Sequence, residues 1–236
     1  WRGPWAGISR TNWILTNIDK SPKISDAKKT QYKGEAHFLR GLYYFNLVRL
    51  FGDVPWIDKQ QTASDDLQVS RTSKDIVYQH IIDDFSDAAS MLPAVYENTT
   101  DIGRATKGAA FGLLAKVYLT LKRYNETLVA IDSVMNLGVY SLNRKYEWNF
   151  SDLRENGPES LFEVQYEKDV TAYSEFDILG QGGWHHEYMA PLASINIGGP
   201  WGNFGWFAVY PEFVESYEPG DLRKSVSVWC EGDVYQ

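Results

Sequence analysis

The stretch GEAHFLRGLYYFNLVRLFGDVP, residues 34–55, decides the fold class that we predict for this chain. Apolar residues recur in it at spacings of three and four, and further large apolar residues fill a flanking face. The recurring positions are Ala36, Leu39, Tyr43, Leu47 and Leu50, and the flanking positions are Phe38, Leu42 and Phe45. This pattern predicts a deeply packed helix that begins near Ser25 or Asp26. It should end at Gly52, because a glycine suits the left-handed position after a helix and Pro55 forces an extended exit.

A second helix is predicted from Ser73, a good N-terminal capping residue, to the residue before Pro93. Its apolar face consists of Ile76, Val77, Ile81, Phe85, Ala88, Ala89 and Leu92. The outer face carries Asp83, Asp84 and Asp87. We interpret this acidic run as a solvated helix surface in preference to a cation site, because charged residues on a helix usually face water.

A pair of helices is predicted next, over 107–121 and 126–137. Thr106 is a suitable N-terminal cap for the first helix, and Gly138 ends the second. The short turn between them requires the two helices to pack antiparallel. Positions that approach the tetratricopeptide spacing are Phe111, Leu114, Ala115, Tyr118, Thr127, Ile131 and Val134. We therefore expect a scaffold of tetratricopeptide-like helix pairs over 5–141, with those residues facing the interior.

The character of the sequence changes over 142–236. Residues 161–166, LFEVQY, alternate like a short strand, and Gly, Trp, Asn and Pro accumulate over 180–206 without a helical period. Loops of this length without secondary structure are uncommon unless they bind a ligand. We therefore expect 142–236 to be a loop-rich, aromatic-rich region that faces a ligand.

Composition limits the classes of partner. The chain has 31 acidic against 23 basic residues and a formal net charge of -8, so a nucleic-acid backbone would be repelled. No apolar run is long enough to cross a bilayer. A single cysteine, Cys230, excludes an internal disulfide and a multi-cysteine metal site. Aromatic residues reach 15%, with 9 Trp and 15 Tyr, and such amphipathic rings suit flat ligand faces as well as protein cores.

Several stretches resemble the SusD/RagB family, in the same order along the chain. The most specific is 34–55, and the others are NWIL at 12–15, GRATKGAA at 103–110, LAKVYL at 114–119, ESLFEV at 159–164 and DLR at 221–223. The resemblance therefore covers most of the chain. It implies a mostly α fold of tetratricopeptide-like helix pairs, an α-α superhelix, overlaid by irregular loops with a few short strands.

The same resemblance implies a function. Members of the family are non-catalytic, lipid-anchored proteins of the outer-membrane surface that bind oligo- or polysaccharide for a SusC-like, TonB-dependent transporter. They normally begin with a signal peptide and a lipid-bearing cysteine, and they continue beyond the point where this chain stops. We therefore expect 1–236 to be a single SusD-like domain, incomplete at both ends, from a longer protein whose lipid anchor lies upstream.

Residues in the loops are the candidates for glycan binding. An indole can stack on the apolar C–H face of a sugar ring, while polar side chains bond the hydroxyls. The candidate residues are Tyr173, Trp184, His185, Trp201, Asn203 and Trp206. Any one of these rings could instead pack a loop onto the helical layer. By contrast, we expect Trp13, Trp56 and Trp148 to pack within the protein. We also expect Arg40 to form a buried ion pair, with Glu35 as the candidate partner.

Sequence patterns of catalysis and of metal binding are missing. There is no Gly-x-Ser-x-Gly elbow, no P-loop and no zinc-protease helix. His185 and His186 are adjacent and so point in divergent directions, which does not suit a shared metal. Two other functions stay open, a tetratricopeptide-like adaptor for a protein segment and a glycoside hydrolase with a carboxylate pair. The resemblance favours a glycan-binding protein that is not an enzyme, with no metal and no cofactor.

Overall fold

The computed structural model describes residues 2–65, 67–165 and 209–228. Within these ranges the chain is mostly helical, as predicted, and it divides into two compact units. The first unit comprises residues 1–142 and 156–163, and the second comprises 143–155 and 164–236. The division of one domain into a scaffold and a ligand-facing region stays a prediction.

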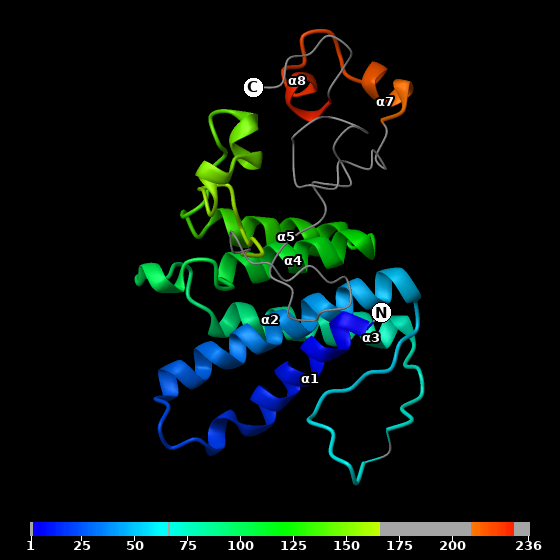
Figure 1. Ribbon diagram of the computed structural model, residues 1–236, viewed down its shortest axis with the longest axis vertical. Helices are drawn as coiled ribbons and strands as arrows, with labels where there is room; N and C mark the ends of the chain where they lie inside the picture. Colours follow the sequence, from blue (N-terminus) through cyan, green and yellow to red (C-terminus); the bar gives the residue numbers. More distant parts are fainter. Residues whose placement is uncertain (1, 66, 166–208, 229–236) are drawn as a thin grey trace, which may run out of the picture. The chain divides into compact units, whose positions relative to one another are not determined.

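The first unit is a row of helices that pack in chain order, each against the next. They are α1 (Arg2–Asn17), α2 (Asp26–Phe51), α3 (Lys74–Met91), α4 (Lys107–Thr120) and α5 (Tyr124–Met135), with short 3-10 turns at Ile18–Lys20 and Thr99–Asp101 (Figure 1). Helix α1 therefore lies at one end of the row and α5 at the other. Among the described residues, no helix combines the length and the apolar character needed to cross a membrane.

Helix α2 forms the centre of the hydrophobic core. At its start the Ser25 hydroxyl accepts a backbone N–H of the first turn, and after its end Gly52 takes a positive φ of 69°, as predicted. Its most deeply buried side chains are Phe38, Tyr44, Phe45 and Leu47. Phe38 and Phe45 belong to the flanking face of the sequence pattern, so that face is the deeper one. The prediction for Leu50 is wrong, because its side chain is exposed.

Helix α3 packs along α2 through the apolar face predicted from the sequence. Its buried apolar side chains are Val77, Tyr78, Ile81, Ile82, Phe85, Ala88 and Ala89. Two positions contradict the prediction: Ile76 is 52% exposed, and Asp84 is buried instead of facing water. The Ser73 side chain makes no capping bond. Asp53 caps the start of α3 instead, since the Asp53 Oδ1 atom accepts the Lys74 N–H at 2.8 Å.

Helices α4 and α5 form the antiparallel pair predicted from the sequence (Figure 1). The Thr106 hydroxyl accepts the Ala109 N–H at 3.1 Å and so caps α4. Helix α5 begins at Tyr124, earlier than predicted, because Lys122 adopts a positive φ of 60° and closes the turn. Of the residues predicted to face the interior, Leu114, Ala115, Thr127 and Val134 are buried, and Phe111 and Tyr118 are half-buried. The prediction for Ile131 is wrong, because it is exposed.

Residues 156–163 belong to the first unit, although they follow a segment of the second. Phe162 packs on Phe38 of α2, with ring centroids 4.9 Å apart. Leu161 lies over Gly112 of α4, where a Cβ would come within 2.6 Å of the Leu161 Cδ1 atom. The strand predicted here is absent from its described part. The neighbouring side chains Leu161 and Phe162 both pack on the helices, and Val164 is exposed, so the alternation does not correspond to one buried face.

The second unit contains short helical turns in its described part. They are the 3-10 turns Tyr146–Phe150 and Asp152–Arg154 and the helices α7 (Pro211–Glu215) and α8 (Lys224–Ser227). Trp148 is half-buried beneath Arg154, whose guanidinium carbon lies 4.4 Å from the ring centroid, so its predicted packing is confirmed. Asp221 accepts hydrogen bonds from the side chain and the backbone of Arg223, which lower the pKa of the Asp221 carboxyl to about 2.

Candidate functional site

Arg40 and Asp84 form a buried ion pair that joins α2 to α3. The Arg40 Nε and Nη2 atoms donate to the two Asp84 carboxylate oxygens at 2.9 and 2.7 Å. His37 Nδ1 lies 2.7 Å from the same carboxylate. Asp84 is only 2% exposed, and a buried charge is unfavourable unless it is paired and hydrogen-bonded. The predicted ion pairing of Arg40 is confirmed, but the partner is Asp84 and not Glu35.

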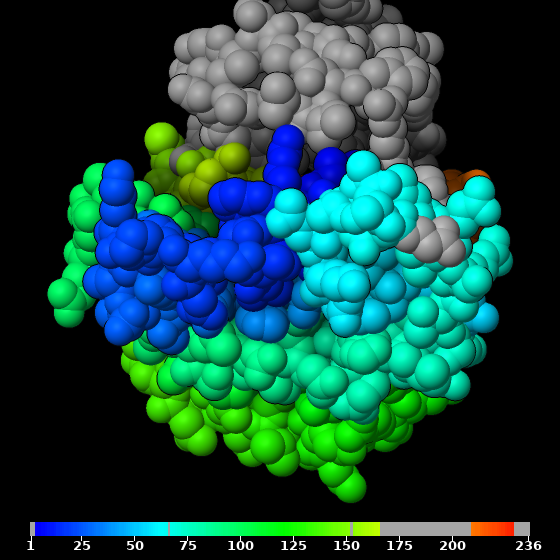
Figure 2. Space-filling model, turned by 90° about the horizontal axis from the view of Figure 1, so that it is seen from below, coloured from blue at the N-terminus to red at the C-terminus, as the bar shows by residue number. Residues whose placement is uncertain are grey.

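The third nitrogen of this guanidinium group, Nη1, bonds to α1 and to the connector between α2 and α3, residues 52–73. Arg40 Nη1 donates to Asn12 Oδ1 at 2.9 Å and to the Asp58 carbonyl at 3.0 Å. Asn12 Nδ2 donates in turn to the Ile57 carbonyl at 2.7 Å, and the Tyr44 hydroxyl accepts the Ile57 N–H at 2.8 Å. Burial raises the pKa of Tyr44. Figure 2 shows the resulting face, with α1 in blue beside the connector in cyan. This network is structural, because it fixes chain segments to one another.

The two tryptophans predicted to pack in this part of the molecule differ. Trp56 stacks on His80 with ring centroids 4.4 Å apart, and its ring lies 4.2 Å from that of Tyr44, as predicted. Trp13 is 57% exposed, so the prediction for Trp13 is wrong. It follows Asn12, whose side chain points inward, and successive side chains on a helix point about 100° apart.

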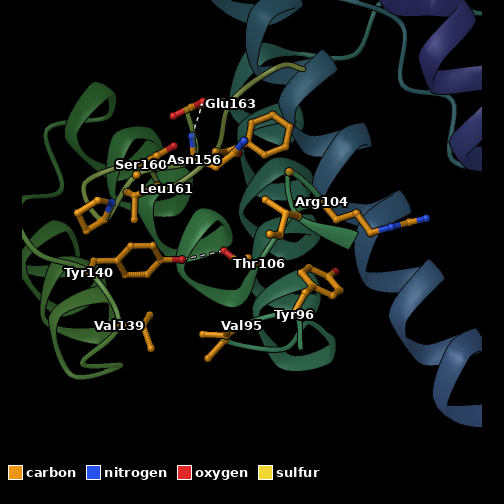
Figure 3. A pocket seen from close by; sticks show the side chains of 16 residues that line it. Val95, Tyr96, Arg104, Thr106, Val139, Tyr140, Asn156, Ser160, Leu161 and Glu163 are labelled. Atoms are coloured by element: carbon orange, nitrogen blue, oxygen red, sulfur yellow. Dashed lines mark hydrogen bonds between the residues drawn. The ribbon is translucent and has the colours of Figure 1, made fainter. Parts of the chain in front are cut away.

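A pocket of about 300 Å³ lies within the first unit, next to the start of α4 (Figure 3). Its walls come from the loop before α4, from Val139 and Tyr140 after α5, and from 156–163. Val95, Ile102 and Val139 contribute exposed apolar surface to it. Its volume is at the lower end of the range for small-molecule sites, which are mostly apolar with a few polar groups.

Tyr140 forms one wall of this pocket. Its hydroxyl lies 2.8 Å from that of Thr106, the residue that caps α4 (Figure 3). Its ring lies against α4 at Gly108, where a Cβ would come within 2.3 Å of Tyr140 Cε2. A larger residue at position 108 would displace the ring. Gly108 is therefore required by close packing at the pocket.

Tyr96 and Arg104 line the pocket and are bonded to other parts of the first unit. The Tyr96 hydroxyl donates to the Ala105 carbonyl at 2.8 Å, and burial raises its pKa. Arg104 pairs with Glu35 of α2 at 2.7 Å, which explains why Glu35 does not pair with Arg40. In Figure 3 the Arg104 side chain extends away from Tyr140. These bonds hold the loop before α4 against α2.

The side chains that line this pocket can form hydrogen bonds and ring contacts with a ligand. Asn156, Ser160 and Glu163 contribute amide, hydroxyl and carboxylate groups, and the Glu163 carboxylate accepts the Asn156 N–H at 2.9 Å. Such groups can bond sugar hydroxyls, while tyrosine rings contact C–H faces. In the part of the chain that the structure describes, no group of three or more His, Cys, Asp or Glu side chains could hold a metal ion.

The residues predicted to bind glycan lie outside the described residues. They are Tyr173, Trp184, His185, Trp201, Asn203 and Trp206. Their role stays a prediction. The pocket in Figure 3 was not predicted, because its walls come from segments that are far apart in the sequence.

The helix pairs, the long connector and the pocket form a mostly helical scaffold. Residues 1–119 match the model of a SusD-like family that is described as starch-binding and associating with the outer membrane. This match covers half of the chain, and the chain belongs to the SusD-like family. The resemblance carried by residues 34–55 is thus confirmed.

Curated relatives agree with this assignment. A SusD-like protein of Bacteroides ovatus is 26% identical over an alignment that covers 100% of this chain and 43% of the relative. A SusD-like protein of Formosa agariphila is 25% identical over 201 residues, which cover 81% of this chain and 38% of the relative. The chain therefore spans less than half the length of these relatives.

Solved structures are also similar to this chain. A SusD superfamily protein of Parabacteroides distasonis is 30% identical, with a TM-score of 0.80 over 94% of this chain and 46% of the other. Surface glycan-binding protein A from Bacteroides fluxus is 26% identical, with a TM-score of 0.80 over 94% and 48%. A laminarin-binding SusD-like protein is 29% identical, with a TM-score of 0.64 over 70% and 37%.

Proposed function

We propose that this chain is part of a non-catalytic glycan-binding protein of the cell surface, which captures oligo- or polysaccharide and delivers it to a TonB-dependent outer-membrane transporter. The observation that carries the proposal is the likeness to surface glycan-binding protein A from Bacteroides fluxus, which extends over 94% of the chain at 26% identity. Membership of a family described as starch-binding and associating with the outer membrane supports it.

The aromatic residues of the predicted loop region would supply the contacts that capture a glycan. Sugar rings present flat C–H faces that stack on indole rings, and this contact needs no catalytic group. Three tryptophans, Trp184, Trp201 and Trp206, are the leading platform residues. Tyr173, His185 and Asn203 would contact the ring edges and bond hydroxyls.

Binding and turnover can be measured on the same material. The complete gene product that contains this chain is run by affinity electrophoresis through gels with laminarin, starch and other polysaccharides, and each mixture is assayed for new reducing ends. We expect retardation by at least one polysaccharide and no release of reducing ends. Release of reducing ends would show a hydrolase, and the absence of retardation across the panel would refute glycan binding.

Single substitutions test the platform residues. Trp184→Ala, Trp201→Ala and Trp206→Ala should each weaken glycan affinity by about tenfold, the equivalent of about 1.4 kcal/mol, which is close to the lower end of the range for fully burying a large apolar side chain, roughly 1.5–3 kcal/mol. Trp13→Ala is the matched control, because Trp13 is an exposed ring on α1 in the first unit. Melting temperatures separate binding from folding: normal affinity in all three variants, or loss of stability in all three, would place the site elsewhere.

The proposed location and partner require a second experiment. The complete protein should fractionate with the outer membrane, react with surface-labelling reagents on intact cells and co-purify with a SusC-like transporter. A lipid-modified cysteine upstream of Trp1 would explain the membrane association. Recovery of the protein in the cytoplasmic fraction without a transporter would contradict the proposal.

A further inference from the structure

The walls of the pocket in Figure 3 are bonded to one another within the first unit. The Lys107 N–H donates to the Pro93 carbonyl at 2.8 Å, which closes the loop before α4. The Ser141 N–H donates to the Pro158 carbonyl at 2.9 Å, which joins the segment after α5 to the wall formed by 156–163. Because the walls are pre-formed, a ligand that enters the pocket has little chain to order, and this favours binding.

One residue of the pocket has an uncommon backbone conformation. Asn156 has a φ of 53°, in the left-handed region that residues other than glycine seldom adopt, although asparagine adopts it more often than most. The Glu163 carboxylate accepts the Asn156 N–H at 2.9 Å and holds this turn closed. Uncommon conformations that the surrounding structure holds in place are concentrated at ligand sites. The turn at Asn156 is therefore an observation in favour of a ligand at this pocket.

The lining of the pocket divides into a polar and an apolar side. In Figure 3, Asn156, Ser160 and Glu163 lie above the Tyr140 ring, whereas Val95 and Val139 lie below it. The two valines are accessible to solvent, with exposed fractions of 57% and 39%. A ligand that matches both sides has an apolar face and carries hydroxyl groups at its edge, as a sugar ring does.

The charged groups of the pocket favour a neutral ligand. Among the described residues that line it, Arg104 is the basic one and Glu163 the acidic one. The Arg104 guanidinium is already paired with Glu35 at 2.7 Å and with Asp101 at 2.8 Å. An anionic ligand would therefore meet the Glu163 carboxylate without a cation to balance it. Sugar hydroxyls, by contrast, can donate to that carboxylate.

We propose that this pocket is a second glycan-binding site, which takes one neutral sugar ring and is built from residues other than the predicted tryptophans of the loop region. The C–H face of the sugar lies on the Tyr140 ring and the two valines, and its hydroxyls bond Ser160 and Glu163. The volume of about 300 Å³ suits a ligand of this small size. The choice of a sugar rests on the proposed function, whereas the location rests on the pocket itself.

Pocket-filling substitutions test the site. The complete gene product is titrated with glucose, galactose, mannose and xylose, and binding is followed by saturation-transfer NMR of the sugar. Val95→Trp places a large ring in the pocket from an exposed position, so it should weaken the affinity for the bound sugar by at least about tenfold. Val129→Trp is the matched control, because Val129 is exposed in the same unit and does not line this pocket.

Two further variants support this comparison. Ser160→Ala removes one hydroxyl from the polar side and should weaken the affinity by about threefold, as expected for one hydrogen bond. Val139→Trp fills the pocket from another wall if Val95→Trp does not fold. The proposal is overturned if none of the four sugars binds, or if the folded pocket-filling variants bind as tightly as Val129→Trp.

Photo-labelling separates this site from the predicted tryptophans. A diazirine derivative of the bound sugar should label peptides within 94–106, 139–140 or 156–163, both in the wild type and in the triple variant Trp184→Ala/Trp201→Ala/Trp206→Ala. Labelling confined to 173–206 in the wild type would overturn the second site and leave the proposed function intact. Pocket labelling in a protein that no polysaccharide retards would support the second site and refute the proposed function.

Discussion

The helix pairs α2–α3 and α4–α5 have similar apolar patterns but very different surroundings. In the first pair most of the large residues on the pattern are buried or half-buried, among them Phe38, Phe45, Ile81 and Phe85, and only Leu50 and Ile76 are exposed. In the second pair Leu119, Leu128, Ile131 and Met135 are exposed. This difference shows that a spacing of three and four predicts an apolar face of a helix. The spacing does not predict whether the same 236 residues contain the side chains that cover that face.

Truncation of a large apolar side chain should give the largest difference in stability between the two helix pairs. Phe38→Ala removes a fully buried ring that contacts Phe85 and Phe162, so it should lower the free energy of unfolding by about 4 kcal/mol. Leu128→Ala in the same 236-residue chain should change it by only about 0.5 kcal/mol, because Leu128 already faces solvent. Urea denaturation of both variants measures the difference. Similar losses in the two would mean that α5 is packed within this chain.

The ion pair between α2 and α3 should give the next largest effect. Asp84→Asn leaves the buried Arg40 guanidinium without its counter-charge, and we expect a loss of about 3 kcal/mol. Asp83→Asn is the matched control, since Asp83 is exposed and only accepts a bond from Gln79. Thermal melts at one pH and one salt concentration compare them. If both variants melt alike, the buried pair does not hold the two helices together.

The smallest effect should come from the helix starts. Thr106→Ala removes the cap of α4 together with the contact to the Tyr140 hydroxyl, and should lower stability by about 1–2 kcal/mol. Ser73→Ala should change stability by only a few tenths, roughly, because its side chain makes no capping bond to α3. Chemical denaturation resolves the two. A larger loss for Ser73→Ala would show that the Asp53 bond to Lys74 does not replace the cap.

Local signals predicted most of the helical scaffold. Ser25, Gly52 and Thr106 act through backbone geometry within one turn, so the helix ends that they mark were found correctly. The start of α5 was misplaced because Lys122 takes a left-handed conformation that glycine or asparagine would have signalled. Asp84 was misplaced because its burial depends on Arg40, which is far away in the sequence.

The candidate site was less predictable. The pocket in Figure 3 joins Tyr96, Tyr140 and Leu161, which no sequence spacing relates, and only the packing of 156–163 on α4 brings them together. The residues chosen as a glycan platform were selected from a predicted loop region by their chemistry. That selection stays a prediction, since they lie outside the described residues.

The two ends of the connector between α2 and α3 are bonded to one another next to the helices. Val54 and Thr72 form an isolated antiparallel bridge, and Asp53 bonds the Lys74 N–H beside it. The stretch from Ile57 to Asp58 is also fixed to the core, whereas Thr62 in the tip, residues 62–71, bonds to Ser64 and Asp65 of the tip itself. Loop-closure entropy rises slowly with length, by about 0.6 kcal/mol for each doubling. Insertions at the tip are therefore nearly free of thermodynamic penalty, which makes it a place where related proteins can diverge in length and acquire new surface without disturbing the core.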